Sequence, residues 1–329
     1  PTRETTLLRW RLFGHITGIS CVILMQRYLT FSFDTITMNY FRLSAGAIVL
    51  LSASLVMYPG EVRSALLQRR LMTPMILLAL IACGGQFLII EGLAGTSATL
   101  VSLIRIIGII LGIIIACVFF EDERETLRGR GLKMGTLLAM AGITGVILGK
   151  EDMTIEYSLG SLYTVFGICL ASTGTVLQKR VVTAMHPLSA GSVVTALMSL
   201  VYAVLTLCWG NVSQVTEVPW YIVVLLFLSG AFGLVVGVGL GFISIRNFGI
   251  ITHRISLLTV PLLVGVLSFL LLDEKLSIVQ SLFGAVLLAG CYLVIKEQSR
   301  KPAEAQQGVR TETHRTDLTT KHTKSTKKD

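Results

Sequence analysis

Long, uninterrupted apolar stretches recur along most of this chain and constrain its fold more than any other feature. A helix needs roughly 20 residues to cross a hydrocarbon core of about 30 Å, and it satisfies its own backbone groups there. Only 14% of the residues are charged, whereas a soluble domain has about 25%. The sequence therefore predicts an all-α integral membrane protein. We predict ten transmembrane helices, at residues 12–31, 36–57, 72–92, 97–120, 132–149, 159–178, 189–209, 220–242, 250–272 and 277–295.

Basic residues are unevenly distributed among the connections between these spans. Nine of the 28 Lys and Arg residues lie in residues 296–329, for which we predict a disordered, basic cytoplasmic tail. Thirteen more lie in residues 1–11 and in alternate connections, and only Arg27, Lys150 and Lys275 lie in the other connections. Basic connections stay on the cytoplasmic side. We expect a multi-pass protein of the plasma or inner membrane, with both termini cytoplasmic.

The second half of the chain resembles the first. An offset of 149 residues places THRISLLTVP on LIRIIGIILG, so that Arg254 falls on Arg105. An offset near 153 places Arg180 on Arg27. Each half holds five predicted spans, an odd number, so the second copy enters the membrane from the opposite side. The sequence thus predicts two inverted five-helix repeats, an arrangement that supports alternating access.

Several segments of the chain carry a family resemblance. In the first half they are MNYFRLSAGAIVLL (38–51), GTSATLVSLI (95–104) and GLKMGTLLAMAGITGVIL (131–148), and in the second half the long segment 256–294. These segments resemble the drug/metabolite transporter superfamily, EamA type. The resemblance implies two EamA-like repeats, at 12–149 and 159–295, around a central cavity for a small organic solute. One departure is Gly112, which occupies the place of Pro261 in the second repeat.

Two arginines inside the predicted spans are the first candidates for solute binding. Arg105 lies about eight residues into its span, roughly 12 Å below the outer edge, and Arg254 lies closer to the cytoplasm. A guanidinium at such depth costs at least a few kcal/mol if it faces lipid. It would hold a carboxylate or phosphate well if it lined the transport path. The alternative is that each arginine reaches the nearer interface or pairs with a protein acid.

Three further residues complete the candidate site. We interpret Arg42 as a structural anchor, since the resembled family often has arginine there. Glu91 is expected level with Arg105 and is a candidate partner for it. His253 is a candidate proton-linked group, because histidine titrates near neutral pH, or else a satisfied polar residue near a helix end. No Asp lies deep in any span, so we expect exchange or facilitated flux instead of firmly proton-driven transport.

The residue pattern favours a secondary transporter, an exporter or exchanger, of a small and preferably anionic metabolite. One alternative is an antiporter of nucleotide sugars or sugar phosphates, which the paired arginines would suit. Another is a multi-pass enzyme acting on lipid head groups, which would need facing acids or histidines. GVILGKE lacks the spacing of a phosphate loop, and we expect no cofactor, metal or nucleic acid. The expected partners are the solute and the lipid bilayer, with the oligomeric state open and a homodimer as one option.

Overall fold

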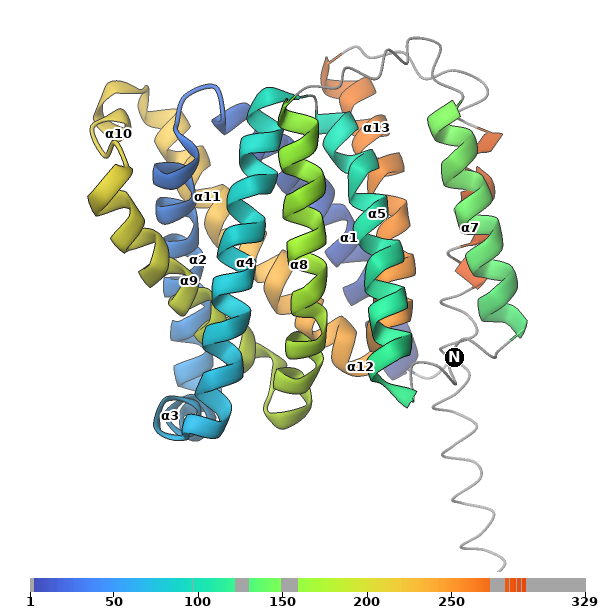
Figure 1. Ribbon diagram of the computed structural model, residues 1–329, viewed down its shortest axis with the longest axis horizontal. Helices are drawn as coiled ribbons and strands as arrows, with labels where there is room; N and C mark the ends of the chain where they lie inside the picture. The colour runs from blue at the N-terminus through green and yellow to red at the C-terminus, as the bar shows by residue number, and fades with distance from the viewer. Residues whose placement is uncertain are drawn as a thin grey trace, which may run out of the picture.

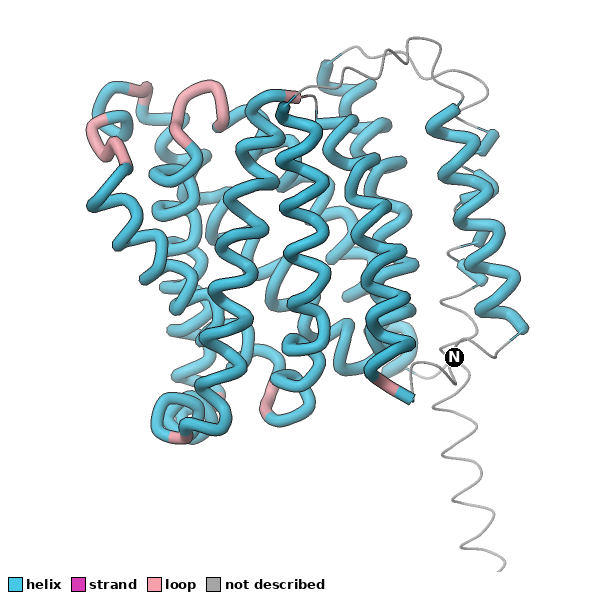
Figure 2. The backbone as a smooth tube through the Cα atoms, in the orientation of Figure 1, coloured by secondary structure: helices cyan, strands magenta, loops and turns pink. Residues whose placement is uncertain are grey.

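The computed structural model describes residues 3–96, 98–121, 130–148, 159–272 and several positions between 282 and 293. Within these residues every regular element is a helix (Figure 1 and Figure 2). The long helices are α1 (Arg3–Leu29), α2 (Thr35–Met57), α4 (Arg69–Gly95), α5 (Ala98–Phe119), α7 (Arg130–Leu148), α8 (Leu159–Ala184), α9 (Pro187–Trp209), α11 (Trp220–Leu234), α12 (Gly241–Ser256) and α13 (Val260–Leu272). The short ones are α3 (Pro59–Leu67), α10 (Gln214–Glu217), the π-helix η1 (Val235–Leu240) and the 3₁₀-helix η2 (Leu257–Thr259).

Five helices of the described part are long and apolar enough to cross a membrane. They are Thr35–Met57, Arg69–Gly95, Leu159–Ala184, Pro187–Trp209 and the continuous stretch Trp220–Leu267, and a shorter apolar helix covers Ile104–Phe119. This all-helical, apolar architecture agrees with the predicted integral membrane protein. The count of ten spans and the inverted repeat stay predictions. The last predicted span, 277–295, falls largely outside the described residues.

A break at Gly249 divides the longest of these apolar stretches. The sequence analysis places two spans here, 220–242 and 250–272. Gly249 has φ 78° and ψ 172°, a conformation open essentially only to glycine. In Figure 1 the chain descends through α11, turns within α12 and rises again through α13. The break therefore lies at the boundary between the two predicted spans.

Local sequence signals start several helices. The Asp34 carboxylate accepts a hydrogen bond from the backbone N–H of Thr37 at 2.8 Å and caps α2, as an N-cap residue does. His186 caps α9, whose first residue is Pro187. Proline also starts α3, at Pro59, within a connection for which no helix is predicted from the sequence.

Close backbone contact joins α4 and α8, which form the most extensive helix pair of the described part. A Cβ atom added at Gly167 would lie 2.8 Å from the carbonyl oxygen of Gly85, and one at Gly92 would lie 2.7 Å from that of Gly160. Small residues permit such approach between membrane helices. The α4–α8 pair thus forms a rigid wall beside the interior of the bundle.

The connections between helices gather at two ends of the bundle. Figure 1 places α3, the turn between α8 and α9, and α12 at one end, and α10 at the other. Exposed arginines mark the first of these ends: Arg63 and Arg69 near α3, Arg180 near the α8–α9 turn and Arg246 in α12. The basic connections predicted to be cytoplasmic therefore share one end.

Candidate functional site

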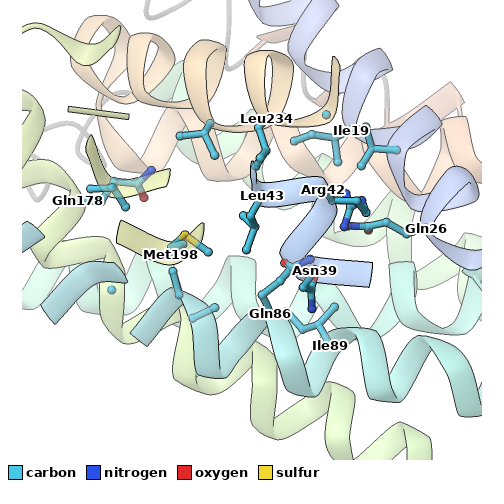
Figure 3. Close-up of a pocket in the computed structure, with 18 of the residues that line it drawn as sticks. Ile19, Gln26, Asn39, Arg42, Leu43, Gln86, Ile89, Gln178, Met198 and Leu234 are labelled. Atoms are coloured by element: carbon cyan, nitrogen blue, oxygen red, sulfur yellow. The ribbon is translucent and has the colours of Figure 1, made fainter. Parts of the chain in front are cut away.

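A cavity of about 310 Å³ lies inside the bundle, lined by α1, α2, α4, α5, α8, α9, α11, η1 and α12 (Figure 3). Most of its wall is apolar, and none of the described residues that line it is acidic. In Figure 3, Gln26 and Arg42 lie on one side and Gln178 on the other. The polar lining residues are Gln26, Asn39, Arg42, Gln86, Arg105 and Gln178. The cavity thus combines two positive charges with neutral amides.

Neutral side chains hold Arg42 in place at one wall of this cavity. Its Nε donates to the hydroxyl of Ser229 at 3.0 Å. The side-chain oxygen of Gln26, in the amide orientation that satisfies its neighbours, accepts from both terminal nitrogens of Arg42 at 2.8 Å. Gln86 donates to the same oxygen at 3.2 Å. Arg42 is therefore hydrogen-bonded on all three nitrogens, while its charge remains without a counter-ion among these partners.

Asn39 presents a free acceptor beside Arg42. The Tyr202 hydroxyl donates to the carbonyl oxygen of Cys83 at 2.9 Å, so its oxygen accepts from Nδ2 of Asn39 at 3.3 Å. These two bonds show that Nδ2 of Asn39 faces Tyr202, so its Oδ1 faces away from Tyr202. That oxygen is buried and has no hydrogen-bond partner. The cavity wall therefore offers an acceptor as well as guanidinium donors.

Arg105 lies between the large cavity and a second, smaller one of about 130 Å³, and it lines both. Its Nε is buried and has no hydrogen-bond partner. An unpartnered guanidinium nitrogen is unusual, because buried polar groups are nearly always hydrogen-bonded. Arg105 is thus positioned to bind a group that enters either cavity.

Arg254 of α12 lines the smaller cavity from the second half of the chain. Its Nη2 donates to the hydroxyl of Thr175 at 2.6 Å, and its Nε has no partner. The side chain packs against Gly112 of α5, where an added Cβ would lie 2.8 Å from that Nε. Gly112 therefore leaves room for Arg254, a physical reason for the departure from proline noted in the sequence.

The two remaining candidates do not line either of these cavities. Glu91, near the end of α4, forms no ion pair with Arg105, although both residues belong to the described part. His253 is buried in α12, and its ring lies 5.2 Å from that of His15. The structure thus brings three arginines to the cavities and places Glu91 and His253 elsewhere.

The glutamines of the cavity were missed by the sequence analysis, although a signal for two of them exists. An offset of 152 residues aligns MQRYL (25–29) with LQKRV (177–181), so Gln26 falls on Gln178 and Arg27 on Lys179. The offset near 153 conceals this match. Arg27 itself is structural, since its Nη1 donates to the carbonyl oxygens of Leu93 at 2.6 Å and Ala94 at 3.1 Å and so caps α4.

The second half of the chain is similar to a known protein family. Residues 158–296 match the model of the EamA-like transporter family. The match confirms the resemblance to the drug/metabolite transporter superfamily. The matched residues include Ser172 and Arg254, so part of the wall of the smaller cavity lies within the matched segment.

Two relatives extend the likeness over most of the chain. A protein of Haemophilus influenzae (strain ATCC 51907 / DSM 11121 / KW20 / Rd), described as an uncharacterized transporter, is 26% identical over 287 residues, covering 84% of this chain and 93% of its own. One solved structure, described only as the crystal structure of a protein, superposes with a TM-score of 0.64 at 16% identity. It covers 91% of this chain and 99% of its own, which shows a shared fold alone.

Proposed function

We propose that this protein is a secondary transporter of a small organic anion, working by alternating access between two inverted repeats. The EamA-like family match and the transporter relative support a membrane transporter and point away from an enzyme. The observation that carries the anionic preference is Arg105, whose Nε lacks a partner while its side chain lines both cavities. A carboxylate or phosphate is the group that a guanidinium holds best.

The lining of the larger cavity narrows the solute class. Asn39 Oδ1 is an unused acceptor, so a solute with a hydroxyl or ammonium donor next to its anionic group would satisfy both walls. At about 310 Å³ the cavity lies at the lower end of the range for ligand pockets. This size favours a small acid or a sugar phosphate over a nucleotide sugar.

Reciprocal packing supports the inverted repeat. With α1 paired to α8, α4 to α11 and α5 to α13, each prominent contact has a counterpart: α4 packs on α8 as α11 packs on α1, and α5 packs on α8 as α13 packs on α1. Positions 19, 22 and 26 line the larger cavity together with 171, 174 and 178, the same positions shifted by 152. If each half adopted the packing of the other, the cavity would open to the opposite side of the membrane.

The direction and setting of transport belong to the same proposal. The protein is an exporter or exchanger of the plasma or inner membrane, with the arginine-rich end of the bundle in the cytoplasm. Exposed basic side chains at that end, among them Arg63 and Arg246, support this orientation.

The test measures thermal stabilisation of the purified full-length protein by lactate, pyruvate, sulfate, glucose and choline. We expect the anions alone to stabilise the wild type, by about 2.7 kcal/mol at 100 times the Kd. Lactate should act more strongly than pyruvate because its hydroxyl can reach Asn39. The variant Arg105→Gln should remain folded and lose the shift, and the control Arg246→Gln, exposed at the end of the bundle, should keep it.

A different result would overturn the proposal. If Arg105→Gln kept the full anion shift, or if glucose and choline stabilised all variants equally, the site would not be an anion site. Flux of the stabilising anion in proteoliposomes completes the test. Binding without flux would contradict a transporter.

A further inference from the structure

We propose that His15 and His253 form a proton-binding site and that this site couples to an anion at Arg254, so that a proton and an anion favour each other's binding. The proton site stands on the geometry of the two histidines, whereas the coupling rests on the anion transport proposed above. The step is the protonation of one imidazole by a proton from solvent, with no other bond made or broken.

The hydrogen bonds of His15 leave one of its ring nitrogens as an open base. Its Nδ1 lies 2.8 Å from the carbonyl oxygen of Val236 in η1. A carbonyl oxygen only accepts, so Nδ1 carries the hydrogen and Nε2 carries the free lone pair. His15 is only 1% exposed, and Nε2 has no partner. This lone pair can accept a proton, although burial disfavours the charged ring.

His253 completes the site from the facing helix. It is 6% exposed, its Nδ1 has no partner, and its ring lies 5.2 Å from the His15 ring with a tilt of 34°. Gly241 leaves space beside both, since a Cβ there would lie 3.2 Å from Cε1 of His15 and 4.0 Å from Cε1 of His253. A proton on one ring disfavours a second proton on the other, so the pair takes up one proton.

The charge that faces this pair is positive. The groups that act electrostatically on His253 are His15 and the adjacent Arg254. The π-helix η1, which packs on both α1 and α12, has the sequence VVGVGL and no titratable side chain. The described α13 residues, Val260–Leu272, also contain none. Protonation therefore places a positive charge beside Arg254.

The charged side chains of the other neighbouring helices contact groups other than the two histidines. From α5, Arg105 lines the two cavities. From α8, Lys179 lies over the Phe120 ring at 4.4 Å. At the start of α9, His186 stacks on Tyr58 with ring centroids 4.0 Å apart.

The acid of α4 lies far from the pair. Glu91 is near the end of α1 that holds Arg27, because Arg27 bonds the carbonyl oxygen of Leu93. His15 is roughly 18 Å away along α1.

Coupling follows from the position of Arg254, which is both the neighbour of His253 and part of the smaller cavity. An anion bound there neutralises the guanidinium and removes its repulsion of a proton on the pair. By linkage, a proton on the pair strengthens anion binding by the same factor. A solute would thus travel with one proton, which replaces the expectation of transport without protons.

The first experiment tests the proton site without any solute. Acid–base titration of the full-length protein in detergent is compared between the wild type and the double variant His15→Asn/His253→Asn. Burial and the charge of Arg254 both disfavour a protonated ring, so we expect the wild type to take up about one proton more than the double variant only at acidic pH, between about pH 6 and pH 4. The control His186→Asn removes a histidine at the end of the bundle, and the pair's proton should persist in it. Identical curves for wild type and double variant would overturn the site.

The second experiment tests coupling with lactate, pyruvate and sulfate, which have no group that titrates near pH 7. We expect binding to the wild type to be at least about fivefold tighter at pH 5.5 than at pH 8 and to take up protons. The double variant should bind with the same affinity at both pH values. Binding by the wild type without proton uptake would overturn the coupling. If no anion binds while the titration difference persists, the anion proposal fails and the proton site stands.

Discussion

Arg42 and Arg105 line the same cavity, but their hydrogen bonds give them different roles. Arg42 is bonded to Ser229 and Gln26, which fixes α1, α2 and α11 to one another. Arg105 has a buried Nε with no partner. A buried charge that lacks partners lowers stability, whereas a hydrogen-bonded network loses stability when a member is removed. The change in stability when each arginine is replaced therefore distinguishes a structural arginine from one that binds a ligand.

The matched variants Arg42→Met and Arg105→Met measure this difference in solute-free protein. We expect Arg42→Met to lower the free energy of unfolding by about 1–3 kcal/mol, because it leaves buried Ser229 and Gln26 without their partner. Arg105→Met should leave stability unchanged or raise it. Denaturation in detergent, followed by circular dichroism, gives both values. Equal losses in the two variants would contradict the assignment.

At the scale of elements, the α4–α8 pair depends on glycine. A Cβ at Gly167 would lie 2.8 Å from the Gly85 oxygen and 2.9 Å from the Ile89 nitrogen. We expect Gly167→Ala to lower the free energy of unfolding by about 1–3 kcal/mol, because backbone atoms must separate. Gly60→Ala, in α3 with nothing within 4 Å of the added atom, controls for helix propensity. A loss no larger than that of the control would show that the helices are not in close contact.

The turn within α12 depends on a second glycine for a different reason. Gly249 adopts φ 78°, and a side chain there is strained by about 1–3 kcal/mol. We expect Gly249→Ala to lower the melting temperature, while Gly237→Ala, where no atom lies within 4 Å of the new Cβ, should have little effect. Similar melting temperatures for both variants would show that the backbone at Gly249 relaxes freely.

At the scale of the whole molecule, we predict that the basic residues gathered at one end set the orientation of the protein in the membrane. On a background in which all six cysteines are replaced by serine, Asn211→Cys lies at one end and Gln68→Cys at the other, both at exposed positions. A membrane-impermeant maleimide should label Asn211→Cys in intact cells and Gln68→Cys only after permeabilisation. Labelling of Gln68→Cys alone in intact cells would reverse the proposed orientation.

Much of the architecture could be predicted from the sequence because lipid imposes a local rule. Each spanning segment must be apolar and must satisfy its own backbone, so it is visible within about 20 residues. The boundary near Gly249 was found in this way, whereas the family resemblance came from particular sequence segments. The break depends on Gly249, because glycine alone adopts that backbone conformation readily.

The polar interior of the bundle was decided by tertiary structure. Asn39 and Ser229 are neutral residues without a distinctive spacing, and their roles follow from the helices packed beside them. Gln26 carries only a repeat signal, its match to Gln178, which does not indicate that it bonds Arg42. His15 bonds a carbonyl oxygen 221 positions away in the chain. Glu91, the candidate partner of Arg105, forms no ion pair with it among the described residues. The sequence by itself determined that the chain is a helical membrane protein and where charge is placed along it. Only the packing of distant helices decided which charges find partners, because inside lipid the partners of a buried polar group come from neighbouring helices.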